Sequence, residues 1–122
     1  MGGAGKPQAA RAAGKASVMA ASADLQRVYD LVRIRLAEPD PQTSYVAALT
    51  AKGADAVLRK IAEESTELLL AAKDGDRDAA VHELADLVFH LLVWMATTGI
   101  TPEDLERELG ARFGKSGLNA SP

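Results

Sequence analysis

The segment from Leu84 to Ala96 constrains the fold most, because it is almost entirely apolar. As a helix it would carry apolar side chains on every side from Leu87 onwards, and such a helix has to be surrounded by other elements. The chain has only 122 residues, which allows one small domain. The few short helices that such a chain can add would not cover this segment completely. We therefore predict that a second subunit covers the remainder.

The rest of the chain shows the helical period and no alternating strand pattern. Four helices are expected at about 25–36, 45–51, 55–72 and 78–97, and a fifth after Thr101. The predicted N-caps include Ser44, Asp55 and Thr101. The predicted fold is an all-α bundle of about four to five helices, completed by oligomerisation. It would occupy residues 23–114, between a flexible N-terminal extension (1–22) and a C-terminal tail (115–122).

Composition excludes several classes of function. The formal net charge of −3 provides no overall basic surface for binding nucleic acid. The absence of cysteine excludes a disulfide framework and a thiolate zinc site, and is compatible with a reducing cytoplasm. The longest wholly apolar run, 91–96, is far shorter than the roughly 20 residues that span a bilayer. We therefore expect a cytoplasmic protein with neither a nucleic acid nor a membrane as partner.

Five carboxylates form two groups with helical spacing. Glu63, Glu64 and Glu67 make the first group, and Glu83 and Asp86 make the second. Acids three or four residues apart share one face of a helix, and a short turn would bring the two faces together. The first group alone fits a solvated helix face equally well. Asp86 argues otherwise, because it stands among apolar residues, and a carboxylate pulled towards a core needs a cationic partner.

The nature of these acids suggests which cation they hold. Carboxylate oxygens without a pattern of histidine ligands suit a hard cation, Mg²⁺ or Mn²⁺. A di-iron bundle normally has Glu-x-x-His on two helices, which neither acidic group provides. His90 shares the face of Glu83 and Asp86, and a buried, hydrogen-bonded histidine is a better interpretation of it than a ligand. His82 lies off that face and is assigned no role.

Several cationic and aromatic residues near the acids fit a phosphate-bearing substrate. Mg²⁺ in such a site usually bridges to substrate phosphates, and the sequence places Lys52, Lys60 and Lys73 before, within and at the end of the helix that carries the first group. Each lysine is also explained as a surface charge, and Lys60 can simply pair with Glu64 four residues later. Tyr45 is a candidate for stacking on a base, or equally a core residue.

The acidic motif resembles that of a known superfamily. Glu63-Glu64-x-x-Glu67 followed by Glu83-x-x-Asp86 is similar to the metal motif of the all-α nucleoside triphosphate pyrophosphohydrolases of the MazG type. Within that superfamily, segments 44–53, 58–64 and 71–76 resemble the phosphoribosyl-ATP pyrophosphohydrolases, and the similarity spans about residues 25–113. Arg59 stands where family members often have lysine and Ser65 where they usually have alanine. Neither change affects a carboxylate.

The resemblance implies a fold, a reaction and roles for residues. It implies a MazG-like bundle that is at least a dimer, and Mg²⁺-dependent hydrolysis of phosphoribosyl-ATP to phosphoribosyl-AMP and pyrophosphate, the second step of histidine biosynthesis. The implied metal ligands are Glu64, Glu67, Glu83 and Asp86. Glu63 would act with Glu64 in catalysis by orienting a water molecule or a second ion. The implied substrate-binding residues are Tyr45, Lys52, Lys60 and Lys73, the lysines at 52 and 60 balancing charge on the leaving pyrophosphate.

Two alternatives share parts of this pattern. A house-cleaning pyrophosphohydrolase for stray nucleoside triphosphates would keep the metal site and have a different base pocket. A non-enzymatic helical oligomerisation module would carry the same acids merely as solvated charges. The first alternative predicts a different nucleotide preference, and the second predicts no stabilisation by Mg²⁺.

Overall fold

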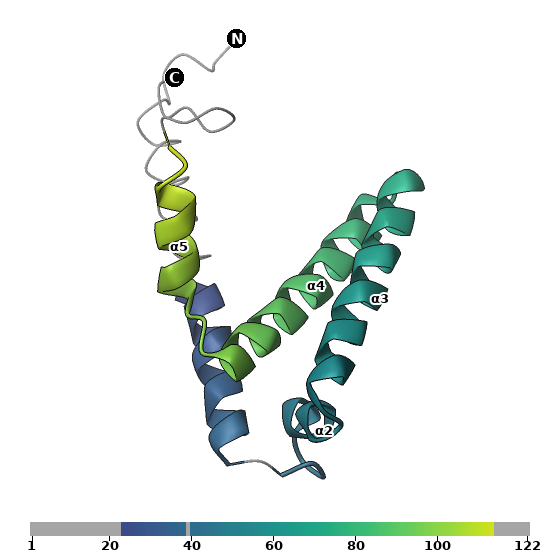
Figure 1. The fold of residues 1–122 in the computed structure, drawn as a ribbon. Coiled ribbons are helices and arrows are strands. Elements are labelled where there is room, and N and C mark those ends of the chain that lie inside the picture. The colour runs from purple at the N-terminus through teal and green to yellow at the C-terminus, as the bar shows by residue number, and fades with distance from the viewer. Residues whose placement is uncertain (1–22, 39, 114–122) are drawn as a thin grey trace, which may run out of the picture.

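A computed structural model describes residues 23–38 and 40–113, and this part of the chain is built from helices and short connections (Figure 1). After a helix over residues 23–37 come α2 (Tyr45–Ala51), α3 (Ala54–Lys73), α4 (Arg77–Thr98) and α5 (Pro102–Gly110). The described residues contain no strand, so the predicted all-α fold is confirmed. The predicted N-terminal extension and C-terminal tail lie outside the described residues.

Two helices begin at the capping residues predicted from the sequence, Ser44 and Thr101. The Ser44 hydroxyl accepts a hydrogen bond from the backbone nitrogen of Ala47 at the start of α2. Thr101 and Asp104 form a reciprocal capping box at the start of α5, with distances of 3.1 and 2.9 Å. Gly99 ends α4 in the left-handed conformation, with a φ of 78°. Local chemistry therefore explains where these helices start and stop.

The start of α3 differs from the prediction. The N-cap is Gly53, which has a φ of 102° and provides no side-chain cap, so the prediction of Asp55 as the N-cap was wrong. Only glycine adopts this backbone conformation readily, and it turns the chain from α2 into α3. Asp55 lies in the first turn of α3, where its negative charge faces the positive end of the helix dipole.

The core holds four helices together at one end of the molecule. Val32, Val46, Leu49, Val57 and Val93 form one buried cluster that joins helix 23–37 to α2, α3 and α4. Tyr29 is buried with two residues of α4 in a second cluster, and its hydroxyl donates a hydrogen bond to the carbonyl of Ile100 at 2.9 Å. Beyond this core, α3 and α4 run side by side as an antiparallel hairpin that leans away from helix 23–37 (Figure 1).

One chain leaves much of α4 uncovered. Leu84 and Leu91 are exposed on α4. The sequence predicts that a second subunit covers what one chain leaves open. Near its C-terminal end a groove of about 320 Å³ runs between α4, α5 and helix 23–37, with Leu105 among its lining residues. The length and hydropathy of α4 would also suit a membrane span, but core helices of soluble proteins pass the same test, and Glu83 and Asp86 lie in its first half. Within the described part of the chain, nothing covers this apolar surface.

Candidate functional site

The first acidic group divides between the inside and the outside of the α3–α4 hairpin. Glu64 is buried, with 6 % of its surface exposed, whereas Glu63 and Glu67 are exposed. The Lys60 ammonium, one helical turn earlier, lies 3.3 Å from Glu63 and 3.5 Å from Glu64. Its hydrogen bond to Glu63 raises the pKa of Lys60, so that the side chain stays positively charged. The structure therefore places one cation directly on the acids of α3.

Carboxylates from both helices meet at the centre of the site. One oxygen each from Glu64, Glu67 and Glu83 lies within 4.8 Å of the other two. Among the described residues, the buried side-chain oxygens without a hydrogen-bond partner are Oε2 of Glu64 and Oε2 of Glu83. A buried carboxylate oxygen without a partner is costly, and a divalent cation would satisfy several such oxygens at once. The donor set consists of oxygens only, which fits Mg²⁺ or Mn²⁺.

Asp86 belongs to a second, more exposed group. Ligand atoms of His82, Glu83 and Asp86 also lie within 4.8 Å of one another, so Glu83 is shared between the two groups. His82 Nε2 lies 3.4 Å from Asp86 Oδ2, and the Asp86 side chain is 42 % exposed. The expectation that Asp86 would be drawn into the core was therefore wrong, and Glu64 is the buried acid. The reason is that this part of α4 is only partly covered in one chain, as the exposure of the neighbouring Leu84 also shows.

His82 was missed in the sequence, although a signal for its position was present. It precedes Asp86 by four residues, the spacing at which side chains on one helix meet. Its placement off the face of Glu83 and Asp86 was wrong with respect to Asp86, which lies within reach one helical turn later. Its place beside two of the acids makes it part of the surroundings of the site.

A hydrogen-bonded pair from α2 and α4 borders the acids. The Tyr45 hydroxyl lies 2.7 Å from His90 Nε2, and His90 Nδ1 lies 2.8 Å from the backbone oxygen of Asp86. His90 is buried, so the prediction of a buried, hydrogen-bonded histidine is confirmed. Burial raises the pKa of Tyr45, the positive charge of Lys60 opposes this, and the negative charge of Glu64 adds to it. Tyr45 is therefore near enough to the acids for their charges to affect its pKa.

The other two predicted substrate lysines lie at helix ends. Lys52 caps the C-terminus of α2, and Lys73 is the last residue of α3. Lys73 is nine residues beyond Glu64, which corresponds to roughly 13 Å along the helix axis. Neither lysine forms an ion pair with an acid in the described part of the chain. Of the three lysines, the structure brings only Lys60 to the acids, and the roles of Lys52 and Lys73 stay predictions.

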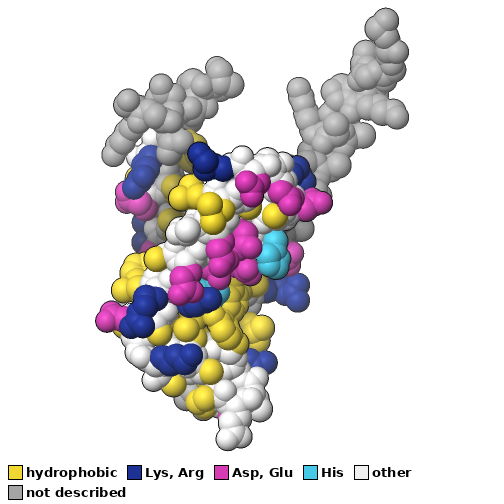
Figure 2. Space-filling model, turned by 90° about the vertical axis from the view of Figure 1, so that its right-hand side faces the viewer, with side chains coloured by type: hydrophobic (Ala, Val, Ile, Leu, Met, Phe, Trp, Pro, Cys, Tyr) yellow, Lys and Arg dark blue, Asp and Glu magenta, His cyan; other side chains and the backbone are white. Residues whose placement is uncertain are grey.

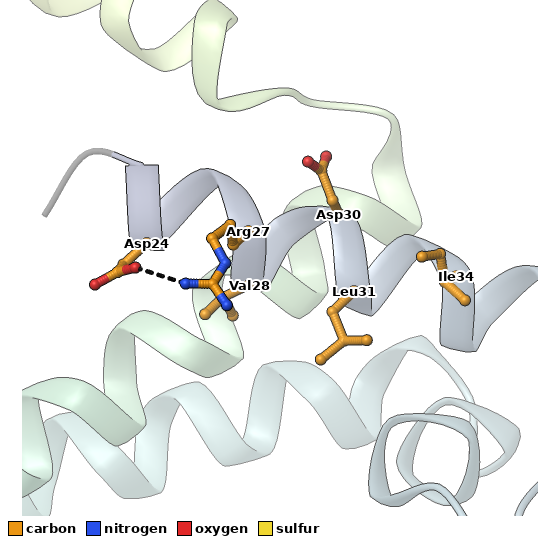
Figure 3. A pocket seen from close by; sticks show the side chains of 6 residues that line it. All are labelled: Asp24, Arg27, Val28, Asp30, Leu31 and Ile34. Atoms are coloured by element: carbon orange, nitrogen blue, oxygen red, sulfur yellow. Dashed lines mark hydrogen bonds and ion pairs between the residues drawn. The ribbon is translucent and has the colours of Figure 1, made fainter. Parts of the chain in front are cut away.

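The acidic side chains are visible as one group on the surface. Figure 2 shows them near the middle of the face that α3 forms, with a histidine beside them and basic side chains along the lower edge. A hollow of about 500 Å³ lies elsewhere, along helix 23–37 (Figure 3). That hollow is lined by this helix alone, and two of its three charged residues, Asp24 and Arg27, pair with each other at 3.2 Å. It shares no residue with the acidic site, which remains the candidate functional site.

Known proteins resemble this chain over its described part. The family model for phosphoribosyl-ATP pyrophosphohydrolase matches residues 25–113. A protein of Methylococcus capsulatus named phosphoribosyl-ATP pyrophosphatase is 50 % identical over 94 residues, which is 77 % of this chain and 89 % of that protein. A protein of Magnetococcus marinus with the same name is 48 % identical over 95 residues, 77 % of this chain but only 38 % of that longer protein.

A third relative carries the same region within a larger protein. The Deinococcus radiodurans protein named histidine biosynthesis bifunctional protein HisIE is 51 % identical over 94 residues, which is 77 % of this chain and 43 % of that protein. The chain thus spans less than half the length of two of these three relatives and most of the length of the third. The family match covers most of the chain and includes every residue of the candidate site. The chain therefore belongs to the phosphoribosyl-ATP pyrophosphohydrolase family.

Proposed function

We propose that this chain hydrolyses phosphoribosyl-ATP to phosphoribosyl-AMP and pyrophosphate, the second step of histidine biosynthesis, as a Mg²⁺-dependent cytoplasmic enzyme. Membership of the family supports the reaction. The observation that carries the proposal is the pair of buried, unpartnered carboxylate oxygens that Glu64 and Glu83 contribute from facing helices. Oxygens so placed need a cation, and a cation among carboxylates suits a substrate that brings phosphates.

The metal would be held by carboxylates of both helices, Glu64 and Glu67 from α3 and Glu83 and Asp86 from α4. Three of these acids already converge within 4.8 Å. The fourth, Asp86, has an oxygen within 4.8 Å of one from Glu83 and pairs with His82. A divalent cation bound there supplies charge that neutralises phosphoryl oxygens and lowers the pKa of a water molecule. Mn²⁺ has the same ligand preference and would substitute for Mg²⁺.

Side chains at the edge of the site would act on the substrate directly. Glu63 is exposed next to the buried Glu64, and its carboxylate would orient the attacking water and accept its proton. The positive charge of Lys60 would stabilise the negative charge that develops on the leaving pyrophosphate. Lys52, Lys73 and Tyr45 complete the proposed set of substrate contacts.

The active form would be a homodimer or a higher homo-oligomer. The proposal is supported by the exposed apolar side chains of α4 and by the apolar groove beside α5. Soluble monomers rarely leave large contiguous apolar patches open to water, and such patches usually mark an interface.

A pyrophosphate-release assay tests the proposed reaction. Purified protein with Mg²⁺ is given phosphoribosyl-ATP and, side by side, a panel of nucleoside and deoxynucleoside triphosphates. We expect release from phosphoribosyl-ATP, its loss on Glu64→Gln, and its retention on Glu38→Gln, which neutralises an exposed acid that belongs to neither group of the site. Activity confined to free nucleotides would instead support a house-cleaning enzyme. A protein without activity and without a response to Mg²⁺ would be an oligomerisation module.

A further inference from the structure

The tautomer of His90 follows from its two neighbours. Nδ1 lies 2.8 Å from the backbone oxygen of Asp86, and a carbonyl oxygen can only accept a hydrogen bond. Nδ1 therefore carries the proton. In the neutral imidazole Nε2 is then an acceptor, and the Tyr45 hydroxyl, 2.7 Å away, must be the donor. The chain of hydrogen bonds runs from Tyr45 through His90 to the backbone of α4.

This arrangement decides what the Tyr45 hydroxyl can still do. A phenol hydroxyl has one hydrogen, and here it is donated in the hydrogen bond to His90, so the oxygen offers only its lone pairs to other groups. The ring is held as well, because it meets His90 edge-on at 5.7 Å and Phe89 at 6.2 Å between ring centroids. Half of Tyr45 is nevertheless exposed, and the charges of Lys60 and Glu64 act on its pKa. The hydroxyl is thus fixed in place on a half-exposed residue that borders the acidic site.

We propose that His90 is a positioning residue that holds the Tyr45 oxygen as a hydrogen-bond acceptor for the nucleoside part of the substrate. The oxygen would accept from an O–H or N–H donor of a ribose or the base. It would not donate to a phosphoryl oxygen, because its only hydrogen is already engaged by His90. The identity of the substrate in this inference rests on the proposed function. The hydrogen bonds between Tyr45, His90 and Asp86 are independent of that function.

The first test needs no catalysis. The chain has only two histidines, His82 and His90, so nitrogen NMR of the imidazoles can be assigned by substitution of His82. We expect His90 to show a protonated Nδ1 and an unprotonated Nε2, and the Nε2 signal to shift in Tyr45→Phe. A proton on Nε2, with or without one on Nδ1, would overturn the proposal. So would an Nε2 signal that ignores the loss of the Tyr45 hydroxyl.

The second test is a double-mutant cycle on the hydrolysis of phosphoribosyl-ATP. Tyr45→Phe removes the hydroxyl, and His90→Phe keeps a ring at this position while removing its acceptor. Each should raise KM about three- to tenfold, the value of one net hydrogen bond, and lower kcat much less. The double variant should match either single variant within about twofold, because both remove the same contact. The positioning role of His90 would be refuted if the effects of the two substitutions on KM multiplied in the double variant. It would also be refuted if Tyr45→Phe had the KM of the wild type.

Product inhibition separates the nucleoside contact from a phosphate contact. Tyr45→Phe should weaken inhibition by phosphoribosyl-AMP and leave inhibition by pyrophosphate unchanged, and the opposite pattern would refute the proposal. Comparing AMP with 2′-deoxy-AMP as inhibitors distinguishes a contact to the ribose hydroxyl from a contact to a base N–H.

Thermal melts identify a His90→Phe protein that does not fold. In that case the NMR result and the kinetics of Tyr45→Phe decide whether the proposal holds. Wild-type protein inactive on phosphoribosyl-ATP refutes the proposed function only, and the cycle is then measured on the nucleotide that the panel identifies.

Discussion

Replacing Glu64 by glutamine should stabilise the metal-free protein while abolishing its response to Mg²⁺. Glu64 is buried and lies within 4.8 Å of oxygens of Glu67 and Glu83. Two like charges at 4.8 Å repel by about 3.5 kcal/mol at an effective dielectric constant of about 20. The attraction between Glu64 and Lys60 at 3.5 Å contributes about 5 kcal/mol in the opposite direction at the same dielectric constant. The two repulsions together therefore exceed the attraction by about 2 kcal/mol before screening.

Solvent reduces this difference, because Glu67 and part of Lys60 are exposed. We expect Glu64→Gln to raise the free energy of unfolding of the metal-free protein by about 1–2 kcal/mol, or Tm by roughly 5–15 °C for a domain of this size. In the wild type, Mg²⁺ at a hundred times its Kd should add about 2.7 kcal/mol. In Glu64→Gln, most of that gain should disappear.

Thermal unfolding followed by circular dichroism measures both effects, first with a chelator and then over a Mg²⁺ titration at fixed protein concentration and ionic strength. Glu38→Gln is the matched control, since Glu38 is exposed and belongs to neither group of acids at the candidate site, and it should keep the full response to Mg²⁺. Two results would refute the reasoning. One is a wild-type protein whose Tm does not change when Mg²⁺ is added. The other is a Glu64→Gln protein that is less stable than the wild type when both are measured with a chelator.

Three further predictions concern the metal ligands, the α2–α3 turn and the apolar surface. Asp86→Asn should weaken Mg²⁺ binding at least about tenfold, whereas His82→Ala should not weaken it, because it only frees Asp86 Oδ2; calorimetric titration compares the two. Gly53→Ala should lower the free energy of unfolding by about 1–2 kcal/mol in urea, since alanine is strained at a φ of 102°. Leu105→Glu should shift the protein to a smaller oligomer in light scattering, because it charges the apolar groove, and an unchanged mass would remove this groove from the interface.

The helices were predictable where a local signal is not contradicted by packing. Ser44 and Thr101 cap their helices as their side chains suggest, because capping involves only the neighbouring backbone. Asp55 was misassigned because a glycine two residues earlier adopts a backbone conformation that a pattern of side chains does not reveal. The all-α fold followed from periodicity, which extends over whole helices and is insensitive to such errors.

The burial of the acids was less predictable, because it depends on what covers each helix. The sequence around Asp86 is apolar, and this suggested a buried position. The surrounding apolar residues point partly into water in one chain, so the apolar neighbours of Asp86 did not imply burial. Glu64 fitted a solvated face as well as a metal site, yet it is the buried acid of its group. A helical pattern shows on which face of the helix a residue lies. Whether that face is exposed to solvent depends on what packs against it.

The same property of α4 connects the proposed metal site to the proposed oligomer. The first half of this helix carries Glu83 and Asp86, and its second half carries buried residues of both core clusters together with the exposed Leu91. A partner that covers the exposed side chains would hold the whole helix more rigidly against α3, because a helix moves as one body. The distance between Glu64 and Glu83, which belong to different helices, depends on that contact. Oligomerisation would therefore stabilise the spacing of the carboxylates, and a Leu105→Glu protein that loses its partner should also bind Mg²⁺ more weakly.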